Sequence, residues 1–439
     1  MSSPSDFRKK RLSVTAATAM TQGDDGSRKS PMPQSPGRSR RLSISPELGA
    51  KSTDVPFDQT KVYGTFSCHG VEPGTREGQK VAKINQDRGA VVYPLDVDYK
   101  RIECTEALFC VYDGHGEFGD KVSQFVVTKL PEMLALEVDL LDTTSPDKVG
   151  EALKRAFVAT DEALKADSSV DDEISGTTAV VVLVREYSSS VGELHLWTAW
   201  AGDSRAVLWT VSGDSAECLK SDVIDLSHDH KPDTPKEHNR IKKSGGFVSP
   251  QEEAWGGPAR VWLDAGQEQP GLAMARSIGD RMVKSVGVIP EAELSYKRLD
   301  MSSGKQRYLV LASDGVWEFV CSHEAFTVIS MFLGQGTTHA TTKLIETSAA
   351  RWRKEEGDYR DDITAICVSL HALREDPNWK VRGSSYTNGT NAAVELADRK
   401  KANNGTDENE LANLGKLMQK RMCCGPAPRG DDDNACTVQ

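Results

Sequence analysis

Short apolar runs of strand length are the feature of this sequence that most restricts its fold. Six such runs lie between residues 62 and 370, and most of them end at a Gly or Asp turn. They are 107–112, 177–184, 194–201, 205–210, 308–312 and 363–370. Because only Gly202-Asp203-Ser204 separates 194–201 from 205–210, we expect a hairpin there and a largely antiparallel sheet. A doubly wound nucleotide-binding fold is therefore not expected.

The segments between these runs have the apolar spacing of amphipathic helices. Four segments show it: 119–136, 147–165, 322–332 and 341–354. In the first of them, Val122, Val126 and Leu130 fall on one face, as the period of an α-helix requires. Strands and helices together predict an α+β fold.

Both ends of the chain differ in composition from this region. Residues 1–55 are rich in Ser and Pro and more basic than acidic, so they bury too little apolar surface to fold. We expect a disordered leader over 1–55, one folded domain over 56–372 and a disordered polar tail over 373–439. Ser13 and Ser43 each lie in a basic-basic-x-Ser pattern, which predicts phosphorylation by a kinase. The alternative is that a basic, serine-rich tail contains such patterns by chance.

Charge and cysteine content exclude several classes of protein. The 54 Lys and Arg residues stand against 65 Asp and Glu residues, a net charge of −11, which argues against nucleic acid as the main partner. No stretch approaches the roughly 18 consecutive apolar residues of a membrane helix. Cys110 and Cys367 lie inside apolar runs, so a disulfide framework is not expected and a reducing compartment is. With no apolar secretory signal at the N-terminus, we expect a cytoplasmic monomer, and a nuclear location stays open.

The last four residues fit a prenylation box. Cys436-Thr-Val-Gln439 ends in Gln, which favours a farnesyl group, and Cys423 and Cys424 follow basic residues as candidates for palmitoylation. Lipidated Cys436 would place the protein at a membrane. Against this, the acidic run 431–433 would be repelled by an anionic leaflet.

Acidic residues stand at the ends of three apolar runs. Asp113 and Asp314 each follow a run and precede a Gly, whereas Asp361 and Asp362 come directly before one. A carboxylate at a strand end is held by the sheet and still reaches solvent. Oxygen donors without a Cys or His pair at zinc spacing favour Mg²⁺ or Mn²⁺. Taken singly, each site has a simpler alternative, a common Asp-Gly turn or a solvated pair of charges.

Seven short motifs occur in an order that is similar to a known family. They are Asp113–Gly116, Ser175–Thr178, Ala201–Arg205, Asp229–Pro232, Ala275–Asp280, Ala312–Gly315 and Asp361–Thr364. Together they resemble the metal-dependent protein serine/threonine phosphatases of type 2C, over residues 62–370. The resemblance implies a four-layer αββα sandwich, with two antiparallel β-sheets flanked by helices and the metals in a cleft at one end of the sheets.

The resemblance also implies metal ligands. Asp113 would bridge two Mg²⁺ or Mn²⁺ ions, and the Gly114 carbonyl would bind one of them. Asp314 and Asp361 would complete the site of the other ion. Asp362 stands where the family commonly has Asn, and we expect it to support the site without binding metal.

A third, weaker metal site is implied at Asp203. Asp314 would share it, and Glu318 would take part in place of the more usual Asp. The alternative for Asp203 is a hairpin turn in which the carboxylate caps its own backbone.

Two metal ions of this kind acidify a shared water and neutralise phosphate oxygens during in-line attack, so no side-chain nucleophile is needed. The leaving alkoxide is strongly basic, and His115 is the candidate general acid. The alternative is that His115 is a structural residue paired with a carboxylate.

The phosphate-binding residues of the family are only partly matched. Ala82 stands at the position of the usual Arg, and Gln86 replaces the usual Glu. Lys83 or Lys80 would then bind phosphate as a point charge without the bidentate geometry of Arg. A solvated strand edge is the alternative for both lysines. Asp87 matches the family's next acid and is expected to lie beside the metals.

Two further assignments concern the second half of the region. Arg276 would either bind phosphate or pair with Asp280 to hold a turn, and the structural role is preferred. The segment 231–269 contains several Gly residues and is expected to be a mobile loop beside the cleft.

We therefore expect a serine/threonine phosphatase whose substrates are phosphoproteins. The changes at Ala82 and Gln86 leave one alternative, a catalytically weak, phosphatase-like module that binds phosphoproteins without turnover.

Overall fold

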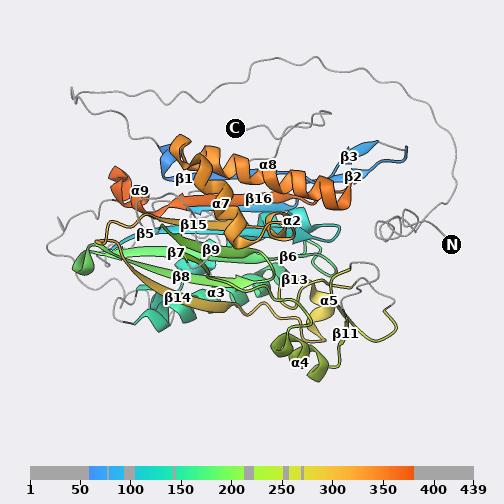
Figure 1. The fold of residues 1–439 in the computed structure, drawn as a ribbon. Helices are drawn as coiled ribbons and strands as arrows, with labels where there is room; N and C mark the ends of the chain where they lie inside the picture. Colours follow the sequence, from blue (N-terminus) through green and yellow to red (C-terminus); the bar gives the residue numbers. More distant parts are fainter. Residues whose placement is uncertain are drawn as a thin grey trace, which may run out of the picture. The chain divides into compact units, whose positions relative to one another are not determined.

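The computed structural model describes residues 59–76, 79–92, 104–141, 145–211, 222–250, 257–267 and 271–379 (Figure 1). The expected leader, with Ser13 and Ser43, lies outside these residues. The lipidation box at Cys436 and nearly all of the expected tail lie outside them as well. None of the described helices is both long enough and apolar enough to span a bilayer.

A seven-stranded sheet carries the first Asp-Gly motif. Its path runs β13 (Ile278–Gly279), β6 (Gly176–Thr177), β5 (Cys104–His115), β7 (Ala179–Tyr187), β8 (Glu193–Ala201) and β14 (Glu293–Asp300), and β4 (Asp87–Val92) also pairs with β5. The long strand β5 pairs with β7 along most of its length and with β6 at its C-terminal end. This end, with Asp113 and Gly114, is held by neighbours on both sides.

A five-stranded sheet carries the other two acidic motifs. Its order is β1 (Tyr63–Cys68), β16 (Ile363–Ser369), β15 (Arg307–Ala312), β9 (Arg205–Thr210) and β10 (Val223–Asp225). Two small sheets are formed by β2 (Val71–Pro73) with β3 (Lys80–Ala82) and by β11 (Phe247–Ser249) with β12 (Arg260–Trp262). All pairings between these described strands are antiparallel.

Helices cover the outer face of each large sheet (Figure 1). Helices α2 (Gly119–Ala135) and α3 (Pro146–Ala166) pack on the seven-stranded sheet, and α7 (Ser322–Phe332) and α8 (Thr337–Glu356) pack on the five-stranded sheet. The shorter helices are α4 (Pro235–Lys243), α5 (Arg281–Lys284), α6 (Asp314–Trp317) and α9 (Leu370–Glu375). Single 3₁₀ turns lie at Gln59–Lys61, Val138–Leu141, Ser188–Ser190, Leu333–Gln335 and Pro377–Trp379. The expected α+β fold of two antiparallel sheets flanked by helices is confirmed.

The central strands are apolar without interruption because both of their faces are buried. In β7, Val180 and Val182 point into the core between the two sheets, whereas Val181 and Leu183 point into the core under α2 and α3. Side chains alternate across a strand, so a strand in the middle of four layers needs apolar residues at every position. This explains why the runs lack the alternating pattern of a half-exposed sheet.

The expected hairpin between 194–201 and 205–210 is wrong. Strand β8 lies in the seven-stranded sheet between β7 and β14, whereas β9 lies in the five-stranded sheet between β15 and β10. Both edges of each strand are already paired, so the two strands do not pair with each other. The chain crosses from one sheet to the other at Gly202–Ser204, and this crossing places Asp203 between the ends of the two sheets.

The expectation of a loop over 231–269 is also incorrect for the part that the structure describes. Helix α4 and the β11–β12 hairpin lie within it. Ile241 and Val261 from these elements form a small core with Val283 and Val288, which follow in the chain. A segment with its own apolar core is a folded subdomain.

Candidate metal centre

Asp113 is fixed by hydrogen bonds to its backbone, which do not involve its carboxylate. Its N–H donates to Oγ1 of Thr178 over 3.0 Å, and its carbonyl accepts from the N–H of Thr178 over 2.8 Å. The Thr178 hydroxyl also lies 2.6 Å from that of Ser204, beside Asp203. Thr178 and Ser204, which sequence reasoning assigned no role, therefore connect the end of β5 to the crossing between the sheets.

Gly114 is required by the close approach of three backbone segments. A Cβ at this position would lie 2.3 Å from the carbonyl oxygen of Gly119 and 2.7 Å from that of Gln86, far inside contact distance. The Gly114 N–H donates to the Gln86 carbonyl over 3.2 Å. A side chain here would push the start of α2 and the segment before β4 away from Asp113.

The acids of the second sheet meet because β15 and β16 are antiparallel neighbours. The C-terminal end of β15 therefore lies beside the N-terminal start of β16. Asp314 opens α6 directly after β15, and Asp361 and Asp362 directly precede β16. A Cβ on Gly315 would lie 2.0 Å from the Asp362 carbonyl oxygen, so only Gly permits this approach.

The carboxylates of both sheets converge on one place. Burial raises the pKa of Asp113 well above its ordinary value, and the charges of Asp87, Asp314, Asp361 and Asp203 raise it further. The pKa of Asp314 is raised in the same way, by burial first and then by Asp203 and Asp361. Carboxylates raise one another's pKa only at short range, so the acids predicted from separate motifs share one site.

Asp203 and Asp87 complete the cluster. Asp203 is 2% exposed, and Lys231 Nζ donates to its Oδ2 over 2.6 Å. Burial opposes ionisation of Asp203, but Lys231 outweighs it and lowers the pKa. Ser313 Oγ donates to Asp87 Oδ2 over 2.7 Å. Within the described residues, Oδ1 of Asp203 and Oδ1 of Asp87 are buried without a hydrogen-bond partner.

These observations fit a site for hard divalent cations. Oxygen atoms supply the donors, the acids repel one another, and two buried carboxylate oxygens lack donors. Mg²⁺ and Mn²⁺ prefer such oxygen ligands, and a cation would relieve the repulsion between the acids.

Asp361 and Asp362 have different surroundings. Both oxygens of Asp362 accept backbone N–H groups, from Gly70 over 2.5 Å and from Gln86 over 2.8 Å. Asp361 Oδ1 accepts Lys83 Nζ over 2.7 Å and one local backbone N–H, that of Asp362, over 2.8 Å, and its charge acts on Asp113. This geometry supports the expectation that Asp362 holds the backbone while Asp361 faces the site.

The remaining residues of the expected site are placed as follows. Nε2 of His115 lies 2.7 Å from Oδ2 of Asp280, and although burial lowers the pKa of His115, Asp280 raises it overall. The Nε2 amide of Gln86 donates to the Gly116 carbonyl over 2.7 Å. Glu318 is exposed after the last turn of α6, whereas Asp113 and Asp314 are half-buried.

The expected pair of Arg276 with Asp280 is wrong, because Asp280 binds His115. Arg276 is 4% exposed and donates to both oxygens of Glu237, over 2.6 and 3.0 Å, and to Glu293 over 3.0 Å. These acids lie on α4 and at the start of β14, both far from Arg276 in the sequence. Arg276 thus joins the small subdomain to the seven-stranded sheet.

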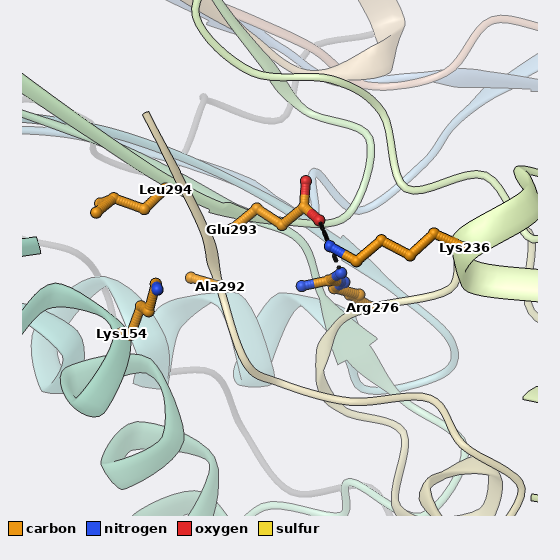
Figure 2. Close-up of a pocket in the computed structure, with 6 residues that line it drawn as sticks. All are labelled: Lys154, Lys236, Arg276, Ala292, Glu293 and Leu294. Atoms are coloured by element: carbon orange, nitrogen blue, oxygen red, sulfur yellow. Dashed lines mark hydrogen bonds and ion pairs between the residues drawn. The ribbon is translucent and has the colours of Figure 1, made fainter. Parts of the chain in front are cut away.

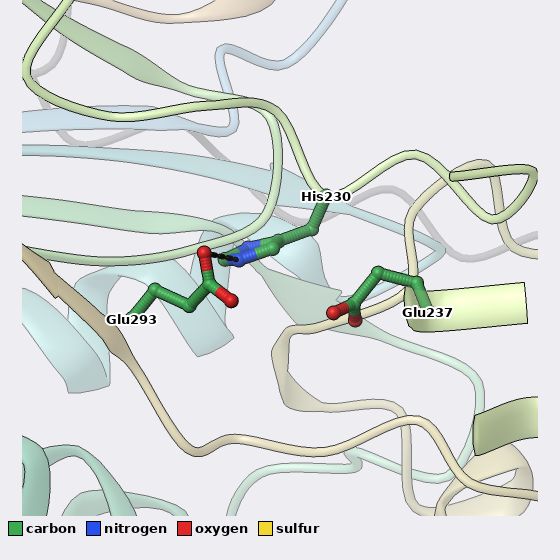
Figure 3. Close-up of side chains that lie close together, drawn as sticks. All are labelled: His230, Glu237 and Glu293. Carbon is green, nitrogen blue, oxygen red and sulfur yellow. Dashed lines mark ion pairs between the residues drawn. The ribbon is translucent and has the colours of Figure 1, made fainter. Parts of the chain in front are cut away.

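Three residues near Arg276 form a second cluster of potential ligand atoms: His230, Glu237 and Glu293, within 4.8 Å of one another (Figure 3). Cations already pair with both carboxylates. Arg276 and Arg240 bind Glu237, and Arg276 and Lys236 bind Glu293. We therefore interpret the cluster as an ion-pair network. Sequence reasoning noted the motif that contains His230 but gave the His no role.

A cavity of about 410 Å³ adjoins this network (Figure 2). It is lined by Lys154, Lys236, Arg276, Ala292, Glu293 and Leu294. Each of its three cations has a carboxylate partner. Lys154 pairs with Glu151, Lys236 with Glu293, and Arg276 with Glu237. The cavity therefore presents no unpaired charge to a ligand.

Comparisons with known proteins agree with the fold and the motifs. The family model for protein phosphatase 2C matches residues 78–357. The chain is 35% identical over 349 residues to a probable protein phosphatase 2C 35 of Arabidopsis thaliana, which covers 75% of this chain and 89% of that protein. It is 32% identical over 345 residues to a probable protein phosphatase 2C 12 of Oryza sativa subsp. japonica, with 69% and 84% covered.

Solved structures share the fold. A serine-threonine phosphatase 2C from Toxoplasma gondii superposes with a TM-score of 0.53 at 20% identity, over 70% of this chain and 94% of that chain. A C. elegans sex determining protein superposes with a TM-score of 0.51 at 18% identity, over 73% and 67% of the two chains. The chain belongs to the protein phosphatase 2C family of metal-dependent serine/threonine phosphatases.

The two adjacent acids are expected to respond differently to truncation. Asp362→Ala leaves the N–H groups of Gly70 and Gln86 without an acceptor, and we expect the free energy of unfolding to fall by about 2–4 kcal/mol. Asp361→Ala, the matched control, removes the acceptor of only one N–H, that of Asp362, and also removes repulsion with Asp113, so it should change this free energy by less than about 1 kcal/mol in EDTA. Urea unfolding followed by tryptophan fluorescence measures both values. Equal destabilisation by the two variants would contradict the assignment.

A pH dependence follows from Asp87. Burial and the charge of Asp362 raise its pKa from 3.8 to about 7 in the folded protein. Between these values the unfolded state loses the proton first, so rising pH destabilises the metal-free wild type relative to Asp87→Asn. Each tenfold change in the acid constant is worth about 1.4 kcal/mol, so we expect a gap of about 2–4 kcal/mol above neutral pH.

The measurement is urea unfolding in EDTA across this pH range. Below 3.8 the two proteins should differ little, and saturating Mn²⁺ should reduce or reverse the gap at neutral pH. A gap that does not change with pH would show that the folded state holds Asp87 ionised.

Proposed function

We propose that this protein hydrolyses phosphoserine and phosphothreonine in proteins at a binuclear Mg²⁺ or Mn²⁺ centre, without a phosphoenzyme intermediate. The observation that carries the proposal is the convergence of Asp113, Asp314 and Asp361, from three separate strand ends, on one half-buried site. Asp113, the Gly114 carbonyl, Asp314 and Asp361 would hold the two ions.

Bound ions of this kind supply a water molecule acidic enough to be the nucleophile and neutralise charge on the phosphate. The residues of the chain then have three tasks: holding the ions, binding the phosphate and delivering a proton to the leaving alkoxide. Asp87 orders the site through Ser313 without being needed as a ligand.

His115 is the proposed general acid. Asp280, 2.7 Å from Nε2, orients the ring and raises the pKa of His115, which favours the protonated form that a general acid needs. The alkoxide of Ser or Thr is a poor leaving group unless it is protonated as the P–O bond breaks.

Lys83 is the proposed phosphate-binding residue in place of the Arg missing at position 82. Its Nζ lies 2.7 Å from Asp361 Oδ1, and Asp361 outweighs burial to raise the pKa of Lys83, so the ammonium group stays charged beside the metal ligands. Lys80 pairs instead with Asp358, at 3.5 Å, where the acid is half exposed. A single ammonium group offers charge without the bidentate bonds of Arg.

The first functional test is turnover of a phosphopeptide. Wild type with Mn²⁺ should release phosphate and stop on chelation, and Asp113→Asn should lose at least about 99% of kcat, because it removes a carboxylate charge that would hold the metal ions. Asp358→Asn, a matched change at an exposed acid, should keep near wild-type activity. Phosphopeptide binding by the wild type without phosphate release would favour the alternative of a binding module.

The second functional test compares two lysines. We expect Lys83→Met to raise KM for a phosphopeptide about tenfold, because a charge-assisted hydrogen bond is worth about 1.5–3 kcal/mol. Lys80→Met should stay within about twofold of wild type. The same KM for both variants would remove Lys83 from phosphate binding.

A further inference from the structure

One buried histidine, His230, binds the backbone where the chain crosses between the two sheets. The backbone N–H of His230 donates to the Gly202 carbonyl over 3.0 Å, and the Gly202 N–H donates to Nδ1 of the His230 ring over 3.1 Å. Gly202 has a φ of 111°, a conformation that favours glycine, and Asp203 follows it directly. Both polar groups of the Gly202 backbone are thus bound by a single residue.

The hydrogen bond from the Gly202 N–H fixes the tautomer of the neutral His230 ring. Because Nδ1 accepts the Gly202 N–H, the proton of the neutral imidazole lies on Nε2, which is 3.5 Å from Oε2 of Glu293 (Figure 3). The ring also stacks on Trp200 at 5.8 Å between centroids and an interplanar angle of 13°. Trp200 and Glu293 are direct partners between β8 and β14, so one strand stacks a ring on the face of His230 and the other places a carboxylate beside its Nε2 edge.

The ion-pair network holds Glu293 in turn. Arg276 and Lys236 bind its carboxylate, and the Ala275 N–H donates to the His230 carbonyl over 2.7 Å. A metal ion on Nε2 would require this proton to move to Nδ1, where it would face the Gly202 N–H. Nδ1 of His230 therefore accepts the Gly202 N–H, and the ring is not a metal ligand.

Residues 230 and 231 act on Asp203 from two directions. His230 sets the backbone before Asp203 and does not touch the carboxylate, while Lys231 binds Oδ2 over 2.6 Å. Of the two carboxylate oxygens, only Oδ1 is left unbonded among the described residues, and it is buried.

We propose that His230 is a positioning residue for the weak third metal site, which it serves by fixing Gly202 so that Asp203 Oδ1 faces the cation. This inference rests on the proposed function, specifically on Asp203 as a ligand. Residues that orient a ligand without touching the metal typically change metal affinity by about 10–100-fold when altered.

Two isosteric variants of the full-length protein separate this role from simple packing. In His230→Asn the amide oxygen stands where Nδ1 accepts the Gly202 N–H, whereas in His230→Gln the amide reaches the position of Nε2 and the acceptor near Gly202 is lost. Both variants lose the ring stacked on Trp200, so their packing defects are matched.

Mn²⁺ titration followed by electron paramagnetic resonance measures the ions bound, independently of activity. We expect His230→Gln to weaken the weakest Mn²⁺ site about 10–100-fold and to leave the tighter sites unchanged. His230→Asn should stay within about threefold of wild type. Equal weakening by Asn and Gln, or no weakening by Gln in the folded protein, would overturn the proposal.

The same titration with Asp203→Asn distinguishes the two levels of inference. Loss of the weak site in Asp203→Asn without loss in His230→Gln would reject the role of His230 and keep Asp203 as a ligand. An unchanged weak site in Asp203→Asn would reject Asp203 as a ligand and the role of His230 with it. Turnover at saturating Mn²⁺, measured in parallel, should show the defect of His230→Gln largely restored.

Discussion

Mutual repulsion of closely spaced carboxylates is the constraint on which the rest of this structure depends. Asp113, Asp314, Asp361 and Asp203 are held close enough to raise the pKa of at least two of them well above the ordinary range. Like charges that are close together and partly removed from water are unfavourable, so without another constraint these carboxylates would lie apart or in water. Their proximity therefore costs stability that the remaining fold must supply, and a bound cation turns the same arrangement into a favourable one.

Hydrogen bonds to the backbone are the main interactions that hold these acids in place. The two large sheets bring their strand ends together, and hydroxyl and carboxylate groups of neighbouring residues hold the peptide groups there, as Thr178 does for Asp113 and Asp362 does for Gly70. The bond from Thr178 holds the backbone of Asp113 and does not involve its carboxylate. Lys83 and Lys231 each place an ammonium group on one acid, which lowers the repulsion without occupying every oxygen.

Much of the fold was predictable because each central strand is buried on both faces and therefore reads as an apolar run. The pairing of those strands was not predictable in the same way. Nearness in sequence favoured a hairpin at Gly202, yet β8 and β9 belong to different sheets, because each already has two partners. The pair expected between Arg276 and Asp280 was wrong for a related reason. Arg276 binds Glu237, which is 39 residues away in sequence, and Asp280 binds His115, which is 165 residues away.

The sequence by itself determined the family and the candidate site residues. An acid before a glycine at the end of an apolar run is a local pattern, and its repetition in a fixed order identifies the family without any coordinates. Only the tertiary structure decided how these residues work together. It separated Asp361 from Asp362 by their partners, and it showed His230 binding both polar groups of Gly202. Such contacts depend on which strands become neighbours, and that is set by the packing of whole layers, which no short stretch of sequence records.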